Sequence, residues 1–193
     1  MISKAIQGYF KTRLISLSSE LPVVMTEMTR VSFRDVGKSI EYKDPMAYEQ
    51  ALFLSSQRKR FDKILNETKG AERNELQKAL GRLDHFSALK DFLDYCRDVH
   101  KTVYFTWAKL ATDISNGKVI MSSEITDEDD IKMIAYSIKR YEDLLEKAKE
   151  YPAWREKITS ETGYIINFLH SIHTNDVNLE QLLKDFNKQE FFK

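Results

Sequence analysis

Residues 89–114, LKDFLDYCRDVHKTVYFTWAKLATDI, decide the fold because their apolar side chains recur every three or four positions. This spacing places those side chains on one face of an α-helix about 40 Å long, at about 1.5 Å per residue. Asn116-Gly117 should end the helix, since both residues tolerate the left-handed backbone. We expect the whole stripe to be buried: Leu89, Phe92, Cys96, Val99, Val103, Trp107, Leu110 and Ile114.

The flanking sequence predicts further helices on the same periodicity. The long helix should extend back through Leu76, and Thr68-Lys69-Gly70 should precede it. Upstream, helices are expected over residues 2–19, ended by Pro22, and over residues 44–66. Downstream, they should begin at Thr126, which can cap the first of them, at Pro152 and at Asn178.

Residues 28–43 have a different pattern, because polar and apolar side chains alternate there around Asp35-Val36-Gly37. A period of two is typical of a strand, so one short β-hairpin is expected near residues 28–43. The predicted fold class is all-α or mainly α. It is a five- to six-helix bundle around a long central helix, in a single helical domain over residues 1–193.

The composition excludes several classes of protein. Of the 193 residues, 42% are hydrophobic and 31% are charged, which is typical of a globular domain. Lys and Arg total 30, as do Asp and Glu, and zero net charge argues against coating nucleic acid through bulk charge. The only cysteine cannot form an internal disulfide, so a reducing, cytoplasmic setting is expected. No apolar run approaches about 18–20 residues, so no transmembrane segment is predicted.

Charge is uneven along the chain: residues 1–60 carry 10 basic and 6 acidic side chains, whereas residues 121–193 carry 10 and 15. Surface charges that complement each other explain this most simply. A basic face for an acidic partner is the functional alternative. Residues 1–19 hold no acid, so they also fit a targeting or membrane-surface helix, although the first helix of a bundle is favoured.

Few residues point to catalysis, and we expect no catalytic residue, no metal and no cofactor. Cys96 lies on the apolar stripe and should be an inert packing residue. His170 and His173 are three residues apart on a helix, but a metal would need further ligands. The chain has no glycine-rich phosphate loop.

A third function, a metal-dependent enzyme, would depend on Asp91, Asp94 and Asp98. These carboxylates share one helical face at spacings of three and four, and such a face can hold Mg²⁺ together with a phosphate substrate. An amphipathic helix needs a solvated face in any case, and this is the favoured interpretation.

The densest basic cluster supports a second function, nucleic-acid binding. It comprises Arg58, Lys59, Arg60 and Lys63, with Arg34 from the same third of the chain. Cations that converge in space contact phosphates, and Tyr9 or Tyr48 could stack on bases.

The leading hypothesis is a non-enzymatic interaction or assembly factor: an adaptor, a scaffold component or an inhibitor. Its partner would be another protein or a second copy of the chain. Such a protein needs exposed aromatic anchors, and several aromatic residues lie outside the stripes or at their edges. The predicted anchors are Phe191, Phe192, Tyr48 and Tyr104.

Overall fold

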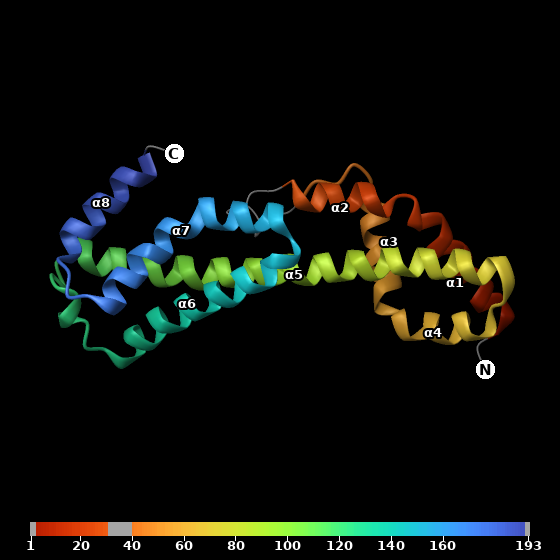
Figure 1. The fold of residues 1–193 in the computed structure, drawn as a ribbon, viewed down its shortest axis with the longest axis horizontal. Coiled ribbons are helices and arrows are strands. Elements are labelled where there is room, and N and C mark those ends of the chain that lie inside the picture. Colours follow the sequence, from red (N-terminus) through yellow and green to blue (C-terminus); the bar gives the residue numbers. More distant parts are fainter. Residues whose placement is uncertain (1–2, 31–39, 192–193) are drawn as a thin grey trace. The chain divides into compact units, whose positions relative to one another are not determined.

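The computed structural model describes residues 3–30 and 40–191, with side chains up to Lys188 (Figure 1). The elements of the described residues are helices, with short 3₁₀ turns at Ser122–Glu124 and Ala148–Glu150. One isolated antiparallel bridge joins Met121 and Asn178. The α-helices are α1 (Lys4–Ser18), α2 (Leu21–Thr29), α3 (Pro45–Ser56), α4 (Arg58–Glu67), α5 (Gly70–Ser115), α6 (Glu128–Lys147), α7 (Pro152–Thr174) and α8 (Leu179–Phe191).

The all-α prediction is confirmed, whereas the β-hairpin is not supported. Met28 and Thr29 are the last residues of α2, so the first two residues of the predicted hairpin are helical. Residues 31–39 lie outside the described residues, and Ile40–Lys43 form no strand. Val24 and Met28 are both buried, and their spacing of four is that of a helix rather than of a strand.

The long central helix is present as α5, which has 46 residues. Glycines stand at both ends: Gly70 begins the helix and Gly117 follows it, each with φ of +67°. This conformation favours glycine, because a Cβ would clash with the carbonyl oxygen. The predicted stripe is buried except at Trp107, which is half-buried. Its indole packs against the rings of Phe186 and Tyr104, 5.0 and 5.5 Å away, and keeps part of its surface open to solvent.

The residues group into two compact units that share α5. Unit 1 contains α1–α4 and the part of α5 up to Leu93, and unit 2 contains the part of α5 from Asp94 together with α6–α8. This grouping does not test how many domains unfold independently, so the single domain remains a prediction. None of the helices in the described ranges is long and apolar enough to cross a bilayer.

In unit 1, proline and capping residues set where helices begin. Asp44 accepts the backbone N–H of Ala47 and caps α3, with Pro45 in the first turn, as predicted. Pro22 does not end α1 directly. It lies in the first turn of α2, where its missing N–H costs nothing. The helix expected over residues 44–66 is interrupted at Gln57, whose φ of −96° and ψ of 13° separate α3 from α4.

Unit 2 packs α6, α7 and α8 against the second part of α5. The ring of Phe186 in α8 lies between 5.0 and 5.4 Å from those of Trp107, Tyr164 and Phe168. Thr106 of α5 and Ser137 of α6 share a buried hydroxyl hydrogen bond of 2.8 Å. Asp127, rather than Thr126, caps α6 by accepting the N–H groups of Asp129 and Asp130.

A polar clip joins the connection before α6 to the connection before α8. The Ser122 hydroxyl donates to the carbonyl of Asn175 at 2.7 Å and accepts the N–H of Val177 at 2.8 Å. Two backbone bonds reinforce it, from the N–H of Ser122 to Val177 and from the N–H of Leu179 to Ile120. Asn178 also caps α8 by accepting the N–H of Gln181, as its sequence position predicts.

Candidate interaction surface

Helices α1, α3 and α4 meet around the ring of Phe10. This buried ring stacks on Phe53 of α3, with centroids 6.2 Å apart and planes at 21°. It meets Tyr9 and Phe61 edge to face, at 5.5 and 5.7 Å. The guanidinium carbon of Arg60 lies 4.8 Å from its centroid, within the range of a cation–π contact. Phe10 therefore holds residues of three helices in fixed positions.

Two rings of this group remain open to solvent. Tyr9 is 50% exposed and Phe53 is 48% exposed, although both contact Phe10. Arg13 lies 5.4 Å from the Tyr9 centroid, and no ion pair of Arg13 or Arg60 occurs within the described residues. Tyr9, Arg13, Phe53 and Arg60 are called the aromatic–basic face below.

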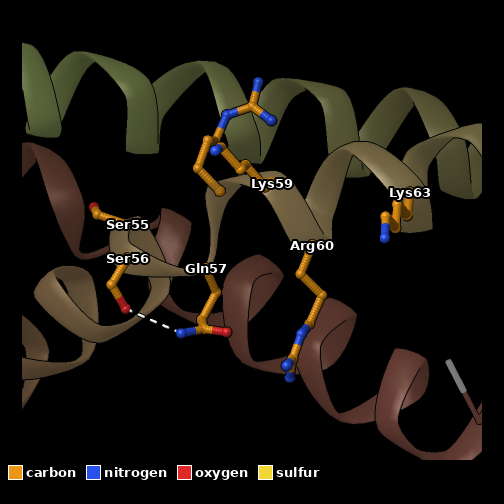
Figure 2. A pocket seen from close by; sticks show the side chains of 7 residues that line it. Ser55, Ser56, Gln57, Lys59, Arg60 and Lys63 are labelled. Carbon is orange, nitrogen blue, oxygen red and sulfur yellow. Dashed lines mark hydrogen bonds between the residues drawn. The ribbon is translucent and has the colours of Figure 1, made fainter.

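The aromatic–basic face borders two hollows. The smaller, of about 120 Å³, is lined by Tyr9, Arg13, Gln50, Phe53 and Leu54. The larger is an open hollow of about 680 Å³ at the junction of α3 and α4 (Figure 2). Its lining is polar and basic: Ser55, Ser56, Gln57, Arg58, Lys59, Arg60 and Lys63.

The predicted basic cluster does not converge on one point. Figure 2 shows that Lys59 and Arg60 leave α4 in different directions, with Arg60 extending toward α1. Lys59 and Lys63 are exposed, and neither forms an ion pair with another described residue. Arg34 lies outside the described residues. Three cations of the predicted five therefore remain available at this hollow.

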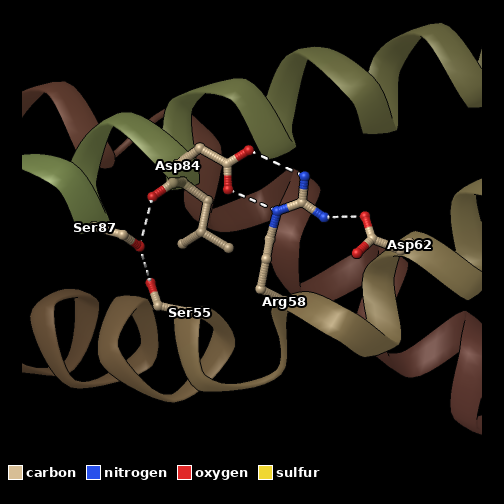
Figure 3. Close-up of polar contacts among 6 residues, drawn as sticks. Ser55, Arg58, Asp62, Asp84 and Ser87 are labelled. Carbon is tan, nitrogen blue, oxygen red and sulfur yellow. Dashed lines mark hydrogen bonds and ion pairs between the residues drawn. The ribbon is translucent and has the colours of Figure 1, made fainter.

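Arg58 forms ion pairs with two carboxylates of unit 1 (Figure 3). Its Nε and Nη2 atoms donate to the two carboxylate oxygens of Asp84 in α5, at 2.6 and 3.1 Å, and Nη1 donates to Asp62. The hydrogen bond with Asp84 raises the pKa of Arg58 above its ordinary value. This arginine therefore joins α4 to α5, and its charge is neutralised locally.

The predicted aromatic anchors take different positions. Tyr48 is half-buried: it stacks on Tyr42 at 4.2 Å and meets Phe86 edge to face at 6.0 Å. Tyr104 is also half-buried, stacked on His100 at 5.1 Å. The side chains of Phe191 and Phe192 lie outside the described residues, so their role as anchors stays a prediction.

The acidic and histidine candidates remain separate from one another. Asp91 and Asp98 are exposed, while the half-buried Asp94 lies 3.5 Å from Arg97. His170 lies 3.9 Å from Glu142, and His173 is exposed. Among the described residues, no three His, Cys, Asp or Glu side chains are grouped so that they could hold a metal ion.

Cys96 is fully buried, as its position on the stripe predicts. Burial raises the pKa of its thiol to about 12. The side chain is therefore a neutral thiol at physiological pH, without the thiolate that nucleophilic chemistry requires.

The two most informative exposed rings, Phe53 and Phe105, were missed by the sequence reasoning. Phe53 precedes the buried Leu54, and Phe105 lies between the stripe positions Val103 and Trp107, so the apolar periodicity singles out neither ring. A large apolar residue off the buried face is the signal that would have found them. Phe105 is 66% exposed and lies in unit 2.

In unit 2, Phe105 of α5 lies beside the first turns of α6. It lines a small hollow with Asp130 and Met133, and Ile131 of α6 is 42% exposed. The α6 start carries four consecutive acids, Asp127–Asp130, of which Asp130 pairs with Lys109 and Glu128 with Lys132.

No protein-family model matches this chain, and no curated protein sequence is significantly similar to it.

Proposed function

We propose that this chain is a non-enzymatic interaction or assembly factor that acts by surface contact through the aromatic–basic face of unit 1. The observation that carries the proposal is a pair of half-exposed rings, Tyr9 and Phe53, fixed on the buried ring of Phe10. Arg13 and Arg60 stand beside them without an ion pair in the described structure. Tyrosine and arginine are enriched among the residues that carry most of the energy of protein interfaces.

Pre-organisation favours this surface over other exposed side chains. The ring contacts and the two cation–π contacts hold the four side chains before a partner arrives, so little rotamer entropy is lost on binding. The hollow between Tyr9 and Phe53 would accept one apolar side chain of the partner. The anchors predicted from the sequence, Tyr48, Tyr104, Phe191 and Phe192, remain candidates for contacts with a partner of their own. A reducing, cytoplasmic setting remains part of the proposal and depends on the single cysteine.

Photo-crosslinking in the native cells tests the proposal. A benzophenone side chain at position 53 should give a discrete crosslinked product, because this position faces the partner. The same side chain at Val23, which is exposed on α2 of the same unit, is the matched control and should give none. Adding Tyr9→Ala should reduce the product from position 53 at least several-fold. Equal products from both positions, or no product, would contradict the proposal.

Nucleic-acid binding is the second candidate, and the larger hollow supports it. Lys59, Arg60 and Lys63 line this hollow, and none forms an ion pair with the described residues. Phosphate groups bind to cations of this kind, with a steep dependence on salt.

A gel shift with a single-stranded oligonucleotide at two salt concentrations tests this candidate. Lys59→Ala with Lys63→Ala should weaken binding to all sequences and lower the salt slope by about one unit per lost contact. Lys4→Ala with Lys78→Ala removes two exposed lysines of unit 1 that do not line the hollow, and it is the matched control. Binding that is unchanged by the double substitution eliminates these cations as phosphate contacts.

A further inference from the structure

Unit 1 leaves several cations at and beside the aromatic–basic face without a counter-charge. Arg13, Arg60 and Lys63 are exposed, and none forms an ion pair with another residue that the structure describes. Asp62, which lies between two of them in sequence, pairs with Arg58 instead. The residues of unit 1 include 15 Lys and Arg and 11 Asp and Glu, a net charge of +4. This region therefore presents positive charge that a partner can neutralise.

The smaller hollow offers apolar and polar contacts side by side. The half-exposed rings of Tyr9 and Phe53 line it, and its volume of about 120 Å³ suits one apolar side chain. Gln50 lines it as well, and its amide forms no hydrogen bond within the described part of the chain. A side-chain amide has both a donor and an acceptor, as a peptide group does. The hollow therefore complements an apolar side chain together with the backbone that carries it.

Arg60 links this hollow to the larger one. Its guanidinium carbon lies 4.8 Å from the centroid of Phe10, the ring on which Phe53 stacks, and its side chain lines the larger hollow. Lys63 also lines the larger hollow. The spacing of three places Arg60 and Lys63 on the same side of α4, whereas Lys59 leaves the helix in another direction (Figure 2). Cations therefore continue along one side of α4 from the aromatic–basic face.

We propose that the aromatic–basic face binds an acidic peptide segment of a partner protein, with one apolar side chain of that segment in the smaller hollow. Carboxylates next to this side chain in sequence would pair with Arg13, Arg60 and Lys63. The inference rests on the proposed function and names the chemistry of the partner. Complementary charge of this kind orients the encounter and selects against other partners.

A peptide matches these contacts better than a nucleic acid does. A strand that binds through its phosphates follows a row of cations, with bases stacked on exposed rings. Two cations, Arg60 and Lys63, share one side of α4, and the whole chain has zero net charge. The amide of Gln50 lies in the same hollow as the rings and is suited to a peptide backbone.

Selection from a library of random dodecapeptides displayed on phage tests the chemistry of the partner. The bait is the full chain at about 150 mM salt. Phage that also bind the Phe53→Ala variant are removed. The remaining peptides should share an apolar residue with Asp or Glu next to it. A selected set without enrichment of acids, or a selection that yields no binding peptide, would overturn the proposal.

Charge reversal then tests the contact itself by fluorescence anisotropy with a selected peptide. Arg13→Glu with Arg60→Glu should raise the Kd about ten-fold or more. A peptide with Lys in place of each acid should prefer this variant to the wild type, which also shows that the variant is folded. Lys4→Glu with Lys78→Glu, two exposed lysines of unit 1 outside both hollows, is the matched control and should change the Kd by less than about two-fold. Wild-type affinity in the reversed variant, or a lysine peptide without this preference, would contradict the proposal.

The crosslinked product from position 53 separates failure of this inference from failure of the proposed function. Mass spectrometry should place the attachment in a segment of another protein that contains several Asp or Glu residues. Attachment to a segment without acids, or a product of twice the chain mass, retains the interaction function and rejects the acidic partner. The absence of both a product and a selected peptide rejects both proposals. Oligonucleotide binding in that case assigns the face to nucleic acid.

Discussion

Cys96 shows how one buried side chain can couple stability to pH. Its thiol has a pKa of about 12 in the folded chain because burial disfavours the thiolate. In the unfolded chain the pKa is about 8.5. The folded state therefore retains a proton that the unfolded state releases as the pH rises between these values.

The free energy of unfolding should accordingly be constant with respect to this group below about pH 8.5. Above that pH it should fall by about 1.4 kcal/mol per unit until the folded thiol itself ionises near pH 12. Urea unfolding at pH 7, 9 and 10 measures this slope.

Lysines and tyrosines also titrate in this range, so the control is Cys96→Ala, and the comparison is between slopes. The variant should be less stable at pH 7 because of the cavity, but its stability should fall less steeply above pH 9. Identical slopes in the two proteins would show that Cys96 does not remain buried as a thiol.

Individual residues differ in how far the sequence predicts their role. The burial of Cys96 follows from its spacing to Phe92 and Val99, which needs only one helix. The Thr106–Ser137 hydroxyl pair does not, because it depends on how α5 and α6 pack across 31 residues of sequence. The pairing of Arg58 with Asp84, which removes it from the basic cluster, is likewise a tertiary contact.

At the scale of elements, two glycines differ in whether their backbone conformation accepts a side chain. Gly81 lies inside α5, and Gly117 follows its end. Gly117 has a φ of +67°, and any Cβ there would be strained. Gly81 lies within the helix, is exposed, and has no atom outside the backbone of its own helix within 4 Å of the position that a Cβ would take.

Gly81→Ala should therefore stabilise the chain by about 0.5–1 kcal/mol, because alanine loses less backbone entropy on forming a helix. Gly117→Ala should destabilise it by about 1 kcal/mol through the strain of the left-handed conformation. Thermal unfolding followed by circular dichroism measures both, and each variant is the control for the other. Shifts of the same sign would mean that one of the two backbone assignments is wrong.

Helix ends were predictable where a residue imposes its own geometry. Asp44-Pro45, Asn178 and Asn116-Gly117 mark ends that the structure confirms. The interruption at Gln57 carries no such mark, since neither glycine nor proline is present and the apolar spacing continues from Leu54 to Phe61. We attribute the interruption to the packing of α3 and α4 on the rest of unit 1. The sequence of this segment alone does not predict it.

At the scale of the whole molecule, α5 is the element that both units share. Its buried stripe continues through Leu89, Phe92 and Leu93 in unit 1 to Cys96 and Val99 in unit 2 without an exposed turn. Helix formation is cooperative along such a stretch. We therefore expect the two units to unfold together, as the single-domain prediction requires.

Two core substitutions test this expectation. Phe61→Leu removes buried volume from unit 1, and Leu169→Ala removes it from unit 2. Both should lower the midpoint of one common urea transition. The free energy of unfolding should fall by about 2–5 kcal/mol for Leu169→Ala. A transition that splits into two, with each variant shifting only one of them, would show that the units unfold independently.

The Ser122 clip has a consequence for hydrogen–deuterium exchange. The amide hydrogens of Ser122 and Leu179 lie outside the helical ladders, and each is bonded across the clip, to Val177 and to Ile120. Neither can exchange until the connection before α6 separates from the start of α8. Once corrected for their intrinsic exchange rates, the two amides should therefore have equal protection factors. Together they would measure the free energy of opening this end of unit 2, which no thermal midpoint reports.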